Sequence, residues 1–164
     1  MTKIQLRILD QAKALIGNEP DYLANAANLS ALLFAELSEI NWVGFYFFDG
    51  QELVLGPFQG RPACVRIPLD RGVCGQAART RKPLIVADVH SFDGHIACDA
   101  ASNAELVVPL LRGEALLGVL DIDSPRHGRF DSDDLTLAEA LVALYVDRSN
   151  SVSCAAFPNA AGAP

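Results

Sequence analysis

The chain lacks the apolar run that a membrane-spanning helix requires, because no stretch of its 164 residues reaches about 18 consecutive apolar positions. Its first segment also lacks the continuous apolar centre of a signal peptide, since Lys3, Arg7 and Asp10 interrupt it. We therefore expect a cytoplasmic protein that does not act at a membrane.

Basic residues are few. The chain has 13 Lys and Arg against 20 Asp and Glu, which gives a formal net charge of −7 at pH 7. Affinity for nucleic acid depends on Lys and Arg that neutralise phosphates, and no local basic patch offsets the acidic balance. Nucleic acid is therefore excluded as the main partner.

Cysteine is scarce, and its four copies are not spaced as in a CxxC redox motif or a zinc knuckle. A lone cytosolic cysteine is most often a small buried hydrophobe. Cys64, Cys74 and Cys98, however, lie close together in the sequence among polar loops and acids, and Cys154 follows near the end. The first three are candidates for thiol chemistry.

Length and composition fit one globular domain. Hydrophobic residues make up 51% and charged residues 20%, and a chain of this size buries about 70% of its unfolded surface. From Ser149 onward, Ser, Ala, Gly, Asn and Pro predominate. We predict a domain over residues 1–148 and a flexible C-terminal tail over 149–164.

Apolar spacing of three and four predicts helices up to Gly17, over 21–39, and over about 131–148 after a capping box that starts at Asp131. Glycines lead into a further short helix over 71–82. Period-two patterns predict strands over 41–48, 52–58, 63–69, 84–87, 106–111 and 115–123. This order indicates an α+β domain with a largely antiparallel sheet.

Two of these segments predict which side chains face a core. The first helix should bury one apolar side, made of Ile4, Ile8, Ala12 and Ile16 with Leu15 beside them. The strand over 41–48 should direct Trp42, Gly44, Tyr46 and Phe48 to one face, and Val43, Phe45 and Phe47 to the other. Trp42 and Tyr46 form either a core stripe or an aromatic wall for a ligand.

Asp121 and Asp123 alternate in the segment GVLDIDSP, which places both carboxylates on one face of a strand, about 7 Å apart. Such a pair holds an ammonium group, or one member stays protonated and acts as an acid. Glu105 joins them if the two hairpin strands pair. The alternative is that both aspartates merely end the strand and begin a turn.

The long polar stretch over 88–105 carries Cys98 and two histidines. Cys98 lies where a thiolate can meet solvent and substrate, and Cys74 lies where a helix N-terminus would favour a thiolate. His90 and His95 are candidates to tune a thiol or bind a metal, although loop histidines more often make ordinary hydrogen bonds.

Four segments together resemble the free methionine-(R)-sulfoxide reductases, a branch of the GAF-domain superfamily. They are NWVGFYF, LGPFQGRPACVRIPLDRGVCGQA, VADVHSFDGHIACDAASNAELVVPL and GVLDIDSPRHGRFDSDD. The resemblance covers about Leu23 to Asp147 and includes the three cysteines, the DGHIACDAAS loop and the DIDSP acids in order. A generic GAF sensor shares the fold and lacks this set.

The resemblance implies a GAF-like single domain in which helices flank a central antiparallel sheet and a long loop covers the pocket. It implies an oxidoreductase that converts free L-methionine-(R)-sulfoxide to L-methionine, with no bound metal or organic cofactor. A homodimer through the first and last helices, by analogy with GAF domains, and a part in methionine salvage and antioxidant defence are further expectations.

The resemblance also implies residue roles. Cys98 is the nucleophile, Cys64 forms a disulfide with it, and Cys74 lies close by as a further participant. The pocket residues that bind substrate match Trp42, Tyr46, Glu105, Asp121 and Asp123. A thioredoxin that NADPH keeps reduced would recycle the disulfide, whereas Cys154 has no counterpart in the pattern.

Two other functions fit the same residues. The first is a stand-alone GAF sensor whose pocket binds a small ligand without turning it over. The second is a zinc-binding or redox-sensing protein built from Cys64, Cys74, Cys98 and His95.

Overall fold

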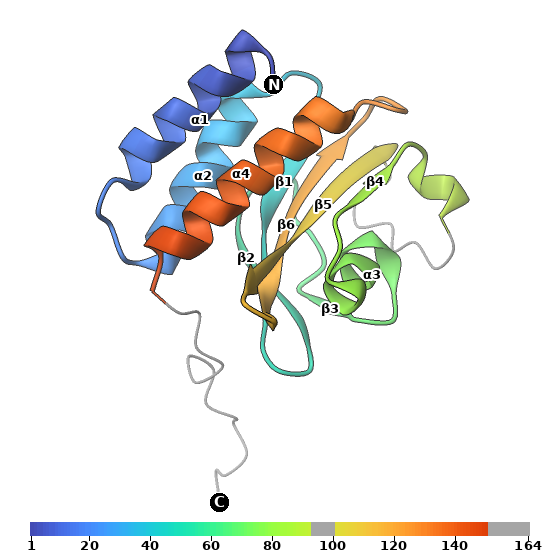
Figure 1. Cartoon of the computed structure of the whole chain (residues 1–164). Helices are drawn as coiled ribbons and strands as arrows, with labels where there is room; N and C mark the ends of the chain where they lie inside the picture. Colours follow the sequence, from blue (N-terminus) through green and yellow to red (C-terminus); the bar gives the residue numbers. More distant parts are fainter. Residues whose placement is uncertain (93–100, 151–164) are drawn as a thin grey trace, which may run out of the picture.

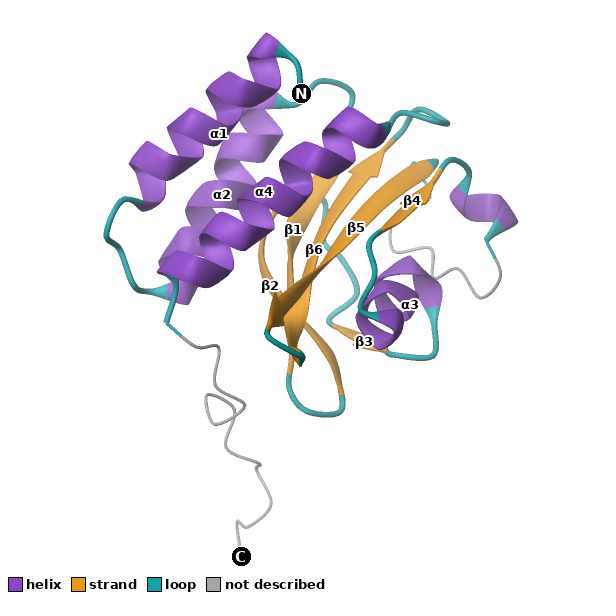
Figure 2. Ribbon diagram, in the orientation of Figure 1, coloured by secondary structure: helices purple, strands orange, loops and turns teal. Residues whose placement is uncertain are grey.

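A six-stranded sheet separates two layers of helices in the computed structural model, which describes residues 1–92 and 101–150 (Figure 1). Three long helices cover one face of the sheet, and one short helix lies on the other face (Figure 2). The predicted α+β class with a central antiparallel sheet is confirmed, and none of the described helices has the length and apolar character to span a bilayer.

The strands follow the spatial order β3-β2-β1-β6-β5-β4, and every neighbouring pair is antiparallel. Their bounds are β1 (Trp42–Phe48), β2 (Glu52–Gly60), β3 (Arg66–Pro68), β4 (Leu84–Val86), β5 (Ala104–Arg112) and β6 (Ala115–Ser124). β1, β6 and β5 lie side by side in the middle of the sheet, so their side chains form its central surface on both faces.

The helices are α1 (Lys3–Ile16), α2 (Tyr22–Glu36), α3 (Gly72–Thr80) and α4 (Ser132–Arg148), with a 3-10 turn, η1 (Val89–Ser91), between β4 and β5. The predicted capping box at Asp131 is present, because Asp131 accepts from the backbone N–H of Asp134 and the Asp134 side chain accepts from that of Asp131. α2 ends three residues before the predicted position 39, since Leu37 is already extended.

The period-two assignment of β1 is confirmed. Val43, Phe45 and Phe47 lie in the core beneath α1, α2 and α4. Trp42 and Tyr46 lie on the opposite face, in a second cluster that includes residues of α3.

The predicted apolar side of α1 is wrong at two positions. Ile8, Ala12 and Ile16 are buried, but Ile4 is 58% and Leu15 44% exposed. Four residues turn a helix through about 400°, so each i,i+4 step drifts by about 40° around the axis. Ile4 therefore lies outside the buried side of the helix, and its neighbour Gln5 is buried there instead. The Gln5 side chain donates to Asp134 Oδ1.

Candidate functional site

The predicted acids lie on the sheet face that α3 covers. Asp121 of β6 is flanked by Gly44 of β1 and Val107 of β5, and Asp123 is flanked by Trp42 and Glu105. Both carboxylates, Glu105 and the aromatic side chains therefore share one face, as the hairpin pairing predicted. The turn interpretation of the two aspartates is wrong, since both belong to β6.

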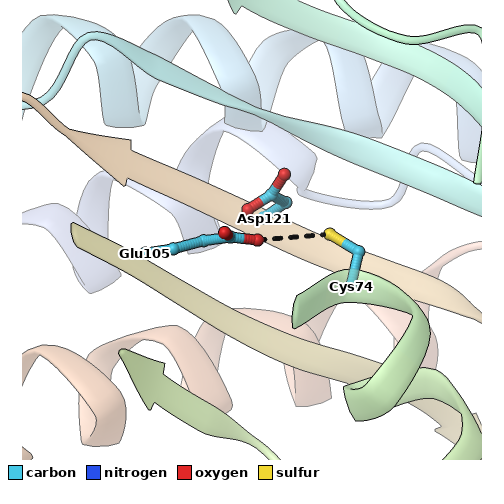
Figure 3. A group of neighbouring side chains, drawn as sticks. All are labelled: Cys74, Glu105 and Asp121. Atoms are coloured by element: carbon cyan, nitrogen blue, oxygen red, sulfur yellow. Dashed lines mark hydrogen bonds between the residues drawn. The ribbon is translucent and has the colours of Figure 1, made fainter. Parts of the chain in front are cut away.

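Cys74 reaches this cluster from the first turn of α3 (Figure 3). The helix begins at Gly72, whose φ of +66° is a conformation that side chains with a Cβ rarely adopt. This turn brings the Cys74 thiol over the sheet, where its Sγ donates to Glu105 Oε1 at 3.7 Å. Sequence reasoning located the helix start, but not the contact across the sheet.

The two central carboxylates are buried without a compensating cation. Glu105 is 7% and Asp121 6% exposed, and neither forms an ion pair within the described part of the chain. Asp121 Oδ1 is buried and has no hydrogen-bond partner among the described residues. Asp123 is half-buried at the edge of the cluster.

Burial controls the protonation of this cluster. It raises the pKa of Asp121 to about 7, although hydrogen bonds with Cys74 and Glu105 lower it. Burial and the neighbouring charges of Asp121 and Asp123 hold the pKa of Glu105 well above its ordinary value. Both shifts favour the protonated form, so the cluster is a place where a carboxyl can hold a proton that an exposed carboxyl would lose.

The thiolate interpretation of Cys74 is wrong. Burial, followed by the charges of Asp121 and Glu105, raises the pKa of the Cys74 thiol well above its ordinary value. These effects outweigh the helix N-terminus, whose influence is about 1 kcal/mol or less at an ordinary position. Cys74 is accordingly a neutral hydrogen-bond donor in this structure.

Aromatic rings form one wall beside the acids. The Trp42 ring stacks on Tyr46, with centroids 5.9 Å apart, and on Phe58 at 5.3 Å. Gly44 makes this stack possible, because a Cβ there would lie 2.4 Å from Phe58 Cβ. Sequence reasoning missed Phe58 and Gly44, and the signal that could have found them is the glycine inside the aromatic run NWVGFYFF.

Trp42 and Tyr46 also form hydrogen bonds with the segment that carries Cys64. Trp42 Nε1 donates to the carbonyl of Arg61 at 3.1 Å, and the Tyr46 hydroxyl donates to the carbonyl of Cys64 at 3.1 Å. Cys64 is half-buried and disulfide-bonded, whereas Cys74 is a free thiol. The predicted nucleophile Cys98 lies outside the described residues, as do His95 and Cys154.

The second histidine candidate is described. His90 lies in η1 and is exposed, and its Nε2 is 2.9 Å from Asn103 Oδ1. This contact favours the ordinary hydrogen-bonding interpretation over thiol tuning or metal binding.

Comparison with known proteins places this geometry in a family. The GAF domain model matches residues 24–147. The free methionine-R-sulfoxide reductase of Escherichia coli K12 is 55% identical over 130 residues, which cover 79% of each chain. The chain belongs to the free methionine-R-sulfoxide reductase family.

Solved structures of family members have the same fold. The fRMsr of Staphylococcus aureus, in complex with substrate, is 49% identical and superimposes with a TM-score of 0.84 over 90% of this chain and 96% of that one. The free methionine-R-sulfoxide reductase of Neisseria meningitidis, in complex with its substrate, is 40% identical, with a TM-score of 0.86 over 90% of each chain. The predicted GAF-like domain is confirmed.

Proposed function

We propose that this protein reduces free L-methionine-(R)-sulfoxide to L-methionine. The observation that carries the proposal is the pair of buried carboxylates, Glu105 and Asp121, which lie beside an aromatic wall without a basic partner in the described part of the chain. Membership of the reductase family supports it, because relatives of this fold form complexes with substrate.

The acid cluster accounts for a free amino acid as substrate. Asp121 and Asp123 lie on one face of β6 and would pair with the α-ammonium group. A methionine sulfoxide inside a peptide has an amide nitrogen in that place, which carries no charge. The Trp42 side chain would pack against the S-methyl group.

Reduction begins with the sulfoxide oxygen, because the sulfur is a poor electrophile until that oxygen receives a proton. Glu105 would supply this proton, since burial and the charges of Asp121 and Asp123 hold its pKa well above the ordinary value. The Cys98 thiolate then attacks the substrate sulfur and forms a sulfur–sulfur bond. The S–O bond breaks as the oxygen passes to the Cys98 sulfur, and cleavage of the sulfur–sulfur bond releases methionine and leaves Cys98 as a sulfenic acid.

A second thiol then removes that oxygen as water and forms a disulfide with Cys98. We assign this step to Cys64, which is half-buried and lies beside the 64% exposed Val65. Cys74 is less suited, because its thiol is buried and stays protonated. A thioredoxin dithiol, reduced in turn by NADPH, would exchange with this disulfide and return both cysteines to thiols.

A homodimer belongs to the same proposal, with α1 and α2 as its interface in place of the first and last helices that GAF analogy suggests. The apolar side chains of Ile4, Leu15, Leu23 and Phe34 are exposed on α1 and α2. Such residues favour association of two copies. Light scattering during size-exclusion chromatography tests this, and a monomer at high concentration would contradict it.

The deciding experiment is turnover of each free methionine sulfoxide epimer with thioredoxin, thioredoxin reductase and NADPH. We expect turnover of the R epimer alone, its loss in Cys98→Ser, and little turnover of N-acetyl-methionine sulfoxide, which lacks the ammonium. The sensor function replaces this proposal if the folded protein reduces neither epimer but still binds the sulfoxide when Cys64, Cys74 and Cys98 are all replaced by Ser.

A further inference from the structure

Three side chains of different chemistry converge beneath α3. Cys74 Sγ and one carboxylate oxygen each from Glu105 and Asp121 all lie within 4.8 Å of one another, and all three residues are buried. They come from α3, β5 and β6, and Figure 3 shows the Cys74 and Glu105 side chains extending toward one another beside Asp121.

These separations are close to those of a zinc site. Zinc–sulfur bonds of about 2.3 Å and zinc–oxygen bonds of about 2.1 Å at a tetrahedral angle place the two ligand atoms about 3.6 Å apart. The Cys74 Sγ to Glu105 Oε1 distance is 3.7 Å. An Asp121 carboxylate oxygen lies within 4.8 Å of both of these atoms and supplies the third ligand.

The Asp121 carboxylate supplies a second, independent indication of a cation. Its Oδ1 is buried without a hydrogen-bond partner among the described residues, and the residue is only 6% exposed. Buried carboxylate oxygens are normally paired, because desolvation without a partner is costly. One oxygen of this ligand carboxylate is therefore buried without a compensating donor or cation in the described part of the chain.

We propose that the reduced protein binds one Zn²⁺ ion through Cys74 Sγ, Glu105 and Asp121, with water in the fourth position. The sulfur ligand favours zinc over hard cations such as Mg²⁺ and Ca²⁺, which prefer oxygen alone. Binding displaces the thiol proton of Cys74 and the carboxyl proton of Glu105, both protons pass to solvent, and no electron is transferred. This set differs from the Cys64, Cys74, Cys98 and His95 site that the sequence suggested.

The ion is an inhibitor rather than a cofactor. Zinc would neutralise the carboxylates that the substrate ammonium and the sulfoxide oxygen need, so it competes with substrate. This consequence rests on the proposed function, whereas the binding itself rests only on the three ligands.

The binding test uses a protein in which Cys74 is the only thiol. The variant Cys64→Ser/Cys98→Ser/Cys154→Ser is titrated with Zn²⁺ without substrate, in a phosphine reductant, and bound metal is measured after equilibrium dialysis. We expect one ion per chain, undisturbed by excess Mg²⁺. Co²⁺ in place of zinc should give a sulfur-to-cobalt charge-transfer band, which reports the Cys74 ligand directly without a further substitution.

Two matched variants in that background sharpen the test. Cys74→Ser should abolish the cobalt band and weaken zinc binding about 100-fold, and Asp121→Asn should keep the band and weaken binding about 10-fold. Absence of bound zinc from the folded three-serine protein, or a zinc affinity unchanged by Cys74→Ser, would overturn the site.

The inhibition test uses the wild-type enzyme. Zinc should raise KM for the sulfoxide while kcat stays constant, a chelator should restore the metal-free rate, and Cys74→Ser should lose this sensitivity relative to its own metal-free rate. Zinc binding by a protein that turns over no sulfoxide would refute the proposed function and leave the metal site standing. Sulfoxide turnover by a protein that binds no zinc would support the proposed function and refute the metal site.

Discussion

The two faces of the sheet are built from the same strands but carry opposite chemistry. Beneath α1, α2 and α4, alternate residues such as Phe45, Leu106 and Leu120 form a continuous apolar core. On the face toward α3, the intervening positions hold Glu105, Asp121 and the Trp42 ring. Burial is similar on both sides, so exposure alone does not distinguish a stabilising residue from a functional one.

The difference lies in whether each buried group finds its partner within the chain. Apolar side chains on the first face contribute to stability by contact with one another. The carboxylates on the second face are desolvated without a cation, which costs stability unless a ligand is bound. Substitutions on the first face should therefore affect folding, and substitutions on the second should affect activity.

The largest effect is expected from Glu105→Gln. The amide keeps the shape of the side chain but cannot transfer the proton to the sulfoxide oxygen, so kcat should fall by about 10²- to 10⁴-fold. Steady-state turnover of the R epimer measures this. Thermal unfolding should show a protein at least as stable as the wild type, and a kcat within a few-fold of the wild type would remove Glu105 from the acid role.

Leu120→Ala is the matching change on the opposite face, one residue before Asp121. Leu120 is 1% exposed, and its truncation should lower the free energy of unfolding by about 2–5 kcal/mol. Urea denaturation measures this loss. The KM of the folded fraction should stay unchanged, and a shift in KM as large as that of a site variant would mean that the two faces do not act separately.

The pH dependence of stability should distinguish the faces as well. The pKa of Asp121 is about 7 in the folded protein and about 3.9 when unfolded. The folded state holds the Asp121 proton more tightly than the unfolded state does. The contribution of this proton to the free energy of unfolding is therefore fully present below pH 4 and is lost as pH rises to 7. Asp121→Asn should flatten this decline in unfolding free energy, measured by denaturation from pH 4 to 8, whereas Leu120→Ala should lower the whole curve in parallel.

The sequence predicted the two faces because strand alternation is a local property. The alternation in β1 assigned Trp42 and Val43 to opposite faces of the sheet. The alternation in β6 assigned Asp121 and Asp123 to the same face before any strand pairing was known. The protonation of Cys74 was not predictable in this way. It depends on α3 crossing over β5 and β6, a tertiary contact between residues 31 positions apart that no local pattern encodes.

The exposed side of α1 shows a second limit of prediction from the sequence. Ile4 and Ile8 are equally apolar, and only the packing of the helices shows that one of them faces solvent. Helical spacing predicts the direction of a buried stripe, but its width depends on what packs against it.

The smallest effect is expected at the rim of the functional face, from Val65→Asp. Val65 is 64% exposed and follows the half-buried Cys64, so an apolar reductant surface would contact it during disulfide exchange. The added charge should lower kcat/KM for thioredoxin by about 3- to 10-fold, because exposed apolar contacts of this size contribute about 1 kcal/mol. Dithiothreitol is too small to need that surface, and its rate is the internal control. An equal loss of kcat/KM with both reductants would mean that Val65 belongs to the substrate pocket itself. An unchanged kcat/KM with both would mean that thioredoxin approaches Cys64 from another side.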